Sequence, residues 1–296
     1  MQGVEWLLGG DPAVRVRVLR DLLDAPADEV AAERRRVARE GWGARLLAEQ
    51  HPDGGWGAGV YSPKWTSTTY TLLHLMWLGL PARHEAALRG LERLWEWQSR
   101  WTAPETCIES ILVRLTASFG HPADRLDVVV GHLLAQQLDD GGWNCRAGGD
   151  PTTHGSFHTS IQALEALEAY RASGGRLDTA RAAARGQKFF LRHRLYQSHR
   201  TGAVAIASST RFPAFPEWHF DVLRGLEYLA GVDATPDERL SEAVALLERK
   251  RRKDGAWSTY AAYAGRQFFS LEQPGASRWT TVRALGVLRW WGQTPP

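Results

Sequence analysis

Apolar residues recur at about every third or fourth position along most of this chain, which is the spacing of an amphipathic helix. No segment alternates strictly between apolar and polar residues, as a half-buried strand does. The pattern therefore predicts an all-α protein. The predicted helices form pairs: 13–23 with 28–49, 66–78 with 82–98, 105–119 with 123–137, 157–171 with 179–195, and 218–230 with 237–252. A last helix at 277–291 is expected beside a short N-terminal helix at 4–8.

The two members of a pair differ in composition. One member is rich in small and apolar residues, with Ala163, Gly225 and Ala284 at equivalent positions of three such helices. The other member carries many arginines and glutamates, as in 30–47 and 236–252. Small residues let helices pack closely, whereas charged faces turn to solvent. We therefore expect an inner ring of apolar helices inside an outer ring of charged helices.

Three turns of the form Asp-Gly-Gly-Trp or Asp-Gly-Ala-Trp follow predicted outer helices and end at Trp56, Trp143 and Trp257. The glycines allow a tight turn, and the tryptophan is expected to cover the end of the ring. In the first two turns a glutamine precedes the first glycine by four residues, and an arginine takes its place in the third. These residues are Gln50, Gln137 and Arg251.

The recurring Gln-x-x-x-Gly-x-Trp resembles the repeat signature of the terpenoid cyclase and protein prenyltransferase superfamily, which includes squalene-hopene cyclase-like proteins. The resemblance covers nearly the whole chain. It implies an α/α toroid of about five to six helix pairs that forms a single domain over residues 1–296. It also implies a central cavity for an isoprenoid or a similar apolar chain.

Charge and composition narrow the partners and the compartment. A formal net charge of +3 is too small to predict a nucleic-acid partner. The two cysteines, Cys107 and Cys145, form no C-x-x-C pair and no disulfide framework, so we expect a reducing, cytoplasmic location. No stretch approaches the roughly 20 apolar residues of a membrane span. Peripheral contact with a membrane stays open for a protein that acts on a lipid, although no clear amphipathic anchor is present.

Candidate chemistry gathers at the predicted starts of the inner helices, which meet at one mouth if these helices are parallel. In the run 218–221 a carboxyl group, Asp221, lies among aromatic residues that would raise its pKa and make it an acid. We expect His219 or His158 to orient it. The expected substrate-binding residues are mostly aromatic, because π faces stabilise a developing cation. They are Trp65, Phe157, Trp218, Phe220, Trp279 and Arg278.

Two mechanisms of the superfamily can be compared with these positions. Protein prenyltransferases hold zinc with an Asp-x-Cys and a later histidine, often His-Thr; Glu105 and Cys107 resemble the first element, and His158 followed by threonine resembles the second. Such a set would bind Zn²⁺ and leave one coordination position open. Class II terpene cyclases carry Asp-x-Asp-Asp, and nothing in this chain matches that motif.

The resemblance therefore leaves the reaction open. Our leading interpretation is an enzyme that binds an isoprenoid or similar apolar molecule and acts on it by cyclisation or prenyl transfer. The alternative is a non-catalytic toroid that binds a ligand or a protein partner, because one fold hosts many functions.

Overall fold

The computed structural model describes residues 3–100, 105–120, 125–145 and 152–293. These residues are mostly helical, as predicted, with one short two-stranded sheet that the sequence did not predict. No helix in this part of the chain is long and apolar enough to cross a membrane. The helices are α1 (Val4–Leu8), α2 (Pro12–Arg17), η1 (Val18–Leu22), α3 (Ala27–Arg36), α4 (Gly41–Ala48), α5 (Thr68–Trp77), α6 (Glu85–Gln98), α7 (Thr106–Phe119), α8 (Leu126–Ala135), α9 (Phe157–Ala172), α10 (Ala180–Arg192), η2 (Ala207–Thr210), α11 (Val222–Gly231), η3 (Glu238–Leu240), α12 (Ser241–Arg249) and α13 (Arg278–Trp290).

Each predicted helix pair packs together. α6 packs against α5, α8 against α7, α10 against α9, α12 against α11, and α1 against α13. The helices of small residues also pack on one another, since α7 contacts both α5 and α9, and α13 contacts both α11 and α2. An ion pair between Arg224 and Glu165 joins α11 to α9, and α4 contacts both α2 and α5. The predicted start of α8 at residue 123 lies outside the described residues.

The helix predicted over 28–49 is wrong as a single element, because the chain breaks it into α3 and α4. α4 begins at Gly41, whose φ of +64° is a conformation that favours glycine. A side chain there would lie 1.9 Å from a carboxylate oxygen of Asp11. That carboxylate accepts hydrogen bonds from the backbone N–H of Ala13 and of Trp42, so it caps α2 and holds the start of α4 together.

The three Gly-Trp turns make one common set of hydrogen bonds. In each turn the tryptophan Nε1 donates, at 2.8 Å, to the carbonyl of a leucine ten residues earlier, near the end of the preceding helix. The tryptophan backbone N–H donates to a threonine or serine hydroxyl on the following helix. Each turn therefore fastens the end of one helix to the start of the next. The leucines are Leu46, Leu133 and Leu247, and the hydroxyls belong to Thr68, Ser160 and Thr281.

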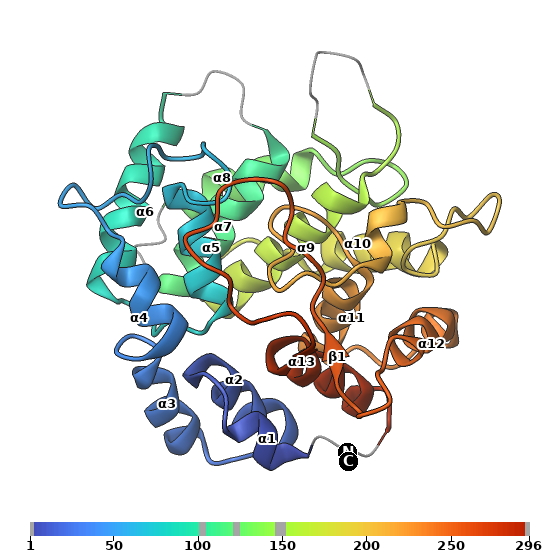
Figure 1. Cartoon of the computed structure of the whole chain (residues 1–296). Helices are drawn as coiled ribbons and strands as arrows, with labels where there is room; N and C mark the ends of the chain where they lie inside the picture. The colour runs from blue at the N-terminus through green and yellow to red at the C-terminus, as the bar shows by residue number, and fades with distance from the viewer. Residues whose placement is uncertain (1–2, 101–104, 121–124, 146–151, 294–296) are drawn as a thin grey trace.

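A long segment joins the two short strands β1 (Trp257–Ser258) and β2 (Ala276–Ser277), and we call it the strap (residues 259–275). It runs across the front of the molecule in Figure 1, drawn in dark red. Two backbone hydrogen bonds tie it to the start of α5: Trp65 N–H donates to the Arg266 carbonyl, and Arg266 N–H donates to the Lys64 carbonyl. At its far end the Glu272 carboxylate accepts from the backbone N–H of Arg278, at the start of α13.

We predict that Trp143→Phe lowers the free energy of unfolding by about 2–4 kcal/mol, because it removes a buried hydrogen bond and part of a buried ring. Trp290→Phe is the matched control. Its Nε1 also donates to a carbonyl, that of Ala234, but the ring is only half-buried, so about 1 kcal/mol is expected. Urea unfolding of both variants measures the difference, and equal losses would contradict the fastening role of the turn.

Candidate functional site

The predicted mouth contains a stack of aromatic rings at the N-terminal ends of α5, α9 and α11. The His219 ring lies between Trp218 and Tyr263, with ring centroids 3.8 and 3.5 Å away and interplanar angles of 24° and 13°. Trp65 and His158 meet the same ring edge-on at 5.9 and 5.5 Å. Four elements far apart in the sequence therefore converge here, and the strap contributes one of the stacked rings.

Asp221 is fully buried and is the N-cap of α11. Its Oδ1 accepts from the backbone N–H of Arg224 at 2.9 Å, whereas its Oδ2 has no hydrogen-bond partner among the described residues. Burial raises the pKa of Asp221 to about 6, against the opposing charge of Arg283. A fraction of this carboxyl group is therefore protonated near neutral pH.

The two histidines of the mouth are uncharged at neutral pH. Burial, with smaller contributions from His158 and Lys64, lowers the pKa of His219 to about 3, and burial with nearby Arg224 lowers the pKa of His158 to about 4. His158 Nδ1 accepts from the backbone N–H of Phe220 at 2.8 Å. Among the described residues no hydrogen bond joins either histidine to Asp221, so an orienting role for them stays a prediction.

Several polar atoms at the mouth are buried and have no hydrogen-bond partner within the described part of the chain. Besides Asp221 Oδ2, they include Trp218 Nε1, His219 Nδ1 and the Tyr263 hydroxyl. Their residues are joined by ring contacts or by direct electrostatic interaction with one another. Buried polar groups in proteins are nearly always hydrogen-bonded, so a group of unpartnered donors and acceptors indicates a site for a polar atom of a ligand or for water.

Residues 213–219, which we call the crossing segment, line two cavities, one among α2, α5, α7, α9, α11 and α13 and one beneath the strap. Arg224 donates to the carbonyls of Glu217 and His219, and Arg283 donates to that of Ala214. Trp279 Nε1 also donates to the Ala214 carbonyl. The segment lacks regular structure, so side chains of α11 and α13 supply the partners that its backbone needs.

A carboxyl group missed by the sequence analysis lies on this segment. Glu217 is 2% exposed and has a φ of +55°, and both of its carboxylate oxygens lie within 3.0 Å of His74 Nε2 on α5. Burial raises the pKa of Glu217, opposed by His74. It lines a cavity of about 420 Å³ between the crossing segment and the strap, whose other walls include Phe215, Phe269 and Leu271. Glu217 directly precedes Trp218 in the sequence, which is the one signal that could have pointed to it.

The helices of small residues, which we expected to be apolar, line a charged cavity. It has a volume of about 290 Å³, and its walls are side chains of α2, α5, α7, α9, α11 and α13. Two ion-pair clusters face it. In one, Glu165 binds both Arg114 and Arg224; in the other, Glu227 binds both Arg17 and Arg283. Arg114 and Arg224 are each the one arginine of their own helix, so α7 and α11 read as low in charge in the sequence.

The remaining predicted substrate-binding residues are not part of the mouth. Phe157 and Phe220 pack on one another and on Phe190 of α10, within the hydrophobic core. Trp279 lines the charged cavity beneath the crossing segment. Arg278 points to α1, where its Nε donates to the Trp6 carbonyl at 2.8 Å.

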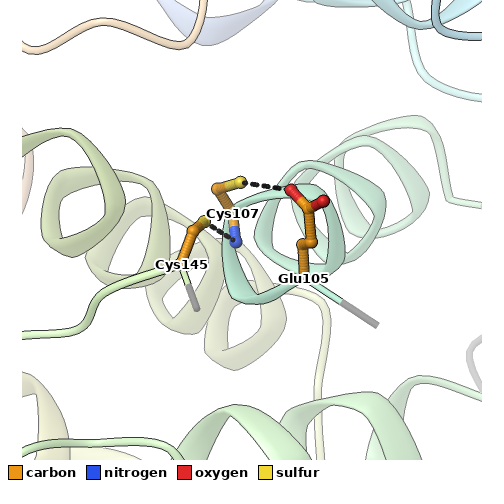
Figure 2. Close-up of side chains that lie close together, drawn as sticks. All are labelled: Glu105, Cys107 and Cys145. Atoms are coloured by element: carbon orange, nitrogen blue, oxygen red, sulfur yellow. Dashed lines mark hydrogen bonds between the residues drawn. The ribbon is translucent and has the colours of Figure 1, made fainter. Parts of the chain in front are cut away.

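The proposed metal ligands Glu105 and Cys107 lie beside Cys145 rather than beside His158. One ligand atom from each of these three residues lies within 4.8 Å of the other two (Figure 2). Cys145 Sγ accepts from the Cys107 backbone N–H at 3.2 Å, and Cys107 Sγ lies 3.8 Å from the Glu105 carboxylate. The hydrogen bond between the thiols raises the pKa of Cys107 and lowers that of Cys145. Two sulfurs and one carboxylate fit Zn²⁺ in type and number, with one position left open.

No protein-family model matches this chain, and no curated protein matches it. Among solved structures it is similar to a protein from Actinoplanes, at 18% identity over 96% of this chain and 91% of that one, with a TM-score of 0.46. It is also similar to the type II terpene cyclase MstE from Scytonema, at 14% identity over 87% of this chain and 97% of that one, with a TM-score of 0.35. A variant of MstE in complex with geranylgeranyl dihydroxybenzoate gives 13% identity, 87% and 96% coverage, and a TM-score of 0.34. The assignment of a function therefore depends on this chain's own residues.

We predict that Asp221→Asn stabilises the protein at about pH 8 and not at about pH 4. Because the folded-state pKa of Asp221 is raised from 3.8 to about 6, its stabilising contribution is complete below the unfolded pKa and is lost as the pH rises through 6. Asparagine keeps the cap without the buried charge, so a gain of about 3 kcal/mol is expected at the higher pH.

Asp237→Asn is the matched control, since Asp237 is also an N-cap. A hydrogen bond from the Arg239 side chain lowers the pKa of Asp237 to about 2, so its replacement should cost a little stability at neutral pH. Urea unfolding across this pH range measures both variants. A loss of stability in Asp221→Asn at about pH 8 would show that Asp221 is stabilised as an anion.

Proposed function

We propose that this protein is a terpenoid cyclase-like enzyme that protonates an isoprenoid or similar unsaturated apolar molecule at the mouth. The observation that carries the proposal is the buried Asp221 carboxyl, which lies beside a stack of aromatic rings and has a raised pKa. One of its oxygens has no partner among the described residues. A carboxylic acid of this kind is a general acid whose proton can be given to a ligand.

The proposed reaction begins with proton transfer from Asp221 to one carbon of a substrate double bond. The O–H bond breaks, a C–H bond forms with the π electrons, and the other carbon becomes a cation. A second double bond then attacks the cation and closes a ring, and loss of a proton to the Asp221 carboxylate ends the sequence. The faces of Trp65, Trp218 and Tyr263 are suited to stabilising the cation, since aromatic faces attract positive charge.

The apolar part of the substrate belongs, in this proposal, in the 420 Å³ cavity beneath the strap. Its walls are mainly apolar, whereas the cavity between the inner helices carries buried ion pairs that an isoprenoid would desolvate without replacing their hydrogen bonds. Glu217 faces the apolar cavity and is held by His74, so it is the second candidate for a proton donor or acceptor.

We also propose that the helices close into a single α/α toroid. Support comes from the succession of contacts from α5 through α7, α9, α11 and α13 to α2, and from α4, which contacts both α2 and α5. In such a ring the mouth is the end where the N-termini of α5, α9 and α11 meet. The strap and the crossing segment then cover that end from outside and from inside.

A zinc ion at Glu105, Cys107 and Cys145 is a second proposal, and it favours prenyl transfer. The fit of the three ligand atoms supports it. When bound, zinc would hold a thiol group as a thiolate, which is the nucleophile that prenyl transfer needs. Neither proposal depends on the other, because these residues lie at the start of α7 and in the loop before α9.

We predict that Asp221→Asn lowers kcat by about 10²- to 10⁴-fold, the usual contribution of a general acid. The assay is incubation with a panel of linear isoprenoids of increasing chain length in D₂O, followed by mass spectrometry. Protonation from solvent adds deuterium at carbon in the cyclised product. Activity of the wild type should fall as the pH rises above about 6, because less Asp221 is protonated.

Asp237→Asn should keep full turnover, and Glu217→Gln tests the second carboxyl. Undiminished cyclisation in Asp221→Asn would refute its role as the acid, and loss in Glu217→Gln alone would transfer that role to Glu217. An isoprenoid that binds stoichiometrically to the wild type but returns unlabelled in every case would support the non-catalytic alternative.

For the metal, we predict that the protein binds one Zn²⁺ and that Co²⁺ in its place gives a thiolate-to-cobalt absorption band. Cys145→Ser should abolish most of the band and weaken zinc binding. His158→Asn is the control, because the motif resemblance predicted this residue as a ligand, whereas the proposal here takes Cys145, whose Sγ lies within 4.8 Å of a ligand atom of Glu105 and of Cys107. Retention of metal in Cys145→Ser together with its loss in His158→Asn would overturn the proposed ligand set.

A further inference from the structure

A third cavity, of about 360 Å³, lies where α2, α3, α5 and α7 meet, near the C-terminal ends of α5 and α7. Four arginine side chains line it, and none of its lining residues is acidic. We call it the basic pocket. The arginines are Arg17, Arg20, Arg34 and Arg114.

Two of these arginines have carboxylate partners outside the pocket. Arg17 binds Glu227 at 2.7 Å, and Arg20 binds the Asp21 carboxylate, with one contact at 2.9 Å. Their charges are therefore offset within the fold. The excess charge of the basic pocket must come from the other two.

Arg34 has no ion-pair partner among the described residues. Its Nε is buried and donates to no protein acceptor. Burial, together with the neighbouring charge of Arg20, lowers the pKa of Arg34. A partly buried guanidinium with an unpaired donor is unfavourable unless something outside the chain accepts from it.

Arg114 shares its carboxylate partner, Glu165, with another arginine. Both oxygens of Glu165 accept hydrogen bonds from Arg224, at 3.0 and 2.6 Å, and one of them also accepts from Arg114, at 2.6 Å. Burial lowers the pKa of Arg114 to about 10. The partial negative charge at the C-terminal ends of α5 and α7, about half a charge each, offsets part of the excess but supplies no acceptor for Arg34 Nε.

We propose that the basic pocket binds a small molecule that carries a phosphate group, with Arg34 and Arg114 as its ligands. Neither guanidinium has a carboxylate to itself, so their two positive charges together match the two negative charges of a phosphate monoester. Their planar groups of N–H donors also suit its oxygens. A monocarboxylate would neutralise only one of the two positive charges. The pocket belongs to a different part of the fold from the mouth, so it is independent of the proposed acid chemistry.

The rest of the pocket indicates that this molecule is organic. The Trp77 ring lies 5.5 Å from the Arg114 guanidinium, and both residues line the pocket together with Met76 and Phe119. Inorganic phosphate would contact only the arginines, whereas an aromatic or aliphatic phosphate ester would also cover the apolar wall. Affinity should therefore increase from inorganic phosphate to phenyl phosphate.

Calorimetric titration of the full chain with inorganic phosphate and with phenyl phosphate, at ionic strength held constant with KCl, tests the proposal. The wild type should bind both, and phenyl phosphate more tightly. Arg34→Gln should weaken binding by roughly tenfold or more, the loss expected for a charge-assisted hydrogen bond. Arg35→Gln is the matched control, since it removes the same charge from the exposed face of the same helix and should bind like the wild type.

Arg34→Gln removes a partly buried guanidinium with an unpaired donor, so the melting temperature of the variant without ligand should equal that of the wild type or exceed it, which shows that the variant is folded. Asp221→Asn should bind both phosphates normally, which separates this site from the mouth. The proposal is overturned if the wild type binds neither phosphate, or if Arg34→Gln binds them as tightly as Arg35→Gln does. Equal affinity for benzoate and phenyl phosphate would overturn the choice of a phosphate.

Discussion

The rest of the structure depends on the hydrogen bonds that the buried guanidinium of Arg224 donates. It binds both oxygens of Glu165 on α9 and the carbonyls of Glu217 and His219 in the crossing segment. A charge buried to this degree is tolerated only when its donors are paired, and the pairs here join two helices to a segment without regular structure. The same contacts close the floor of the mouth and hold the start of α11, so the positions of His219 and Asp221 depend on them.

Much of the fold could be predicted from the sequence, because local chemistry determines it. The Gly-Trp turns and the helix pairs follow from residue type and spacing, and both are present. The break at Gly41 could not be predicted, since it depends on the Asp11 carboxylate, which is distant in sequence. The charged interior also escaped prediction. A single arginine in a helix, such as Arg114 or Arg224, has no periodic signal, and only its partner on another helix shows that it points inward.

The candidate site was predictable only where its residues are contiguous. Trp218, His219 and Asp221 lie within four positions, so the one aromatic run at 218–221 predicted all three of them. Arg278 and Trp279 were predicted from their place at the start of a helix. Their positions around the axis of α13 point Arg278 to α1 and Trp279 to the charged cavity. Tyr263 belongs to the strap, which has no periodicity to mark it. Its stacking on His219 is a tertiary contact that no spacing rule contains.

The anchoring of the strap has a consequence for how the protein is made. Trp65 is bonded to Arg266, about two thirds of the chain later, and Arg278 reaches back to Trp6. Contacts at such sequence separation form last, because the loop between them must be closed first. On the ribosome the aromatic mouth stays open until the C-terminal part of the chain has emerged. The Trp65 ring, which is buried in the folded protein, therefore stays exposed on the nascent chain until the strap has been made.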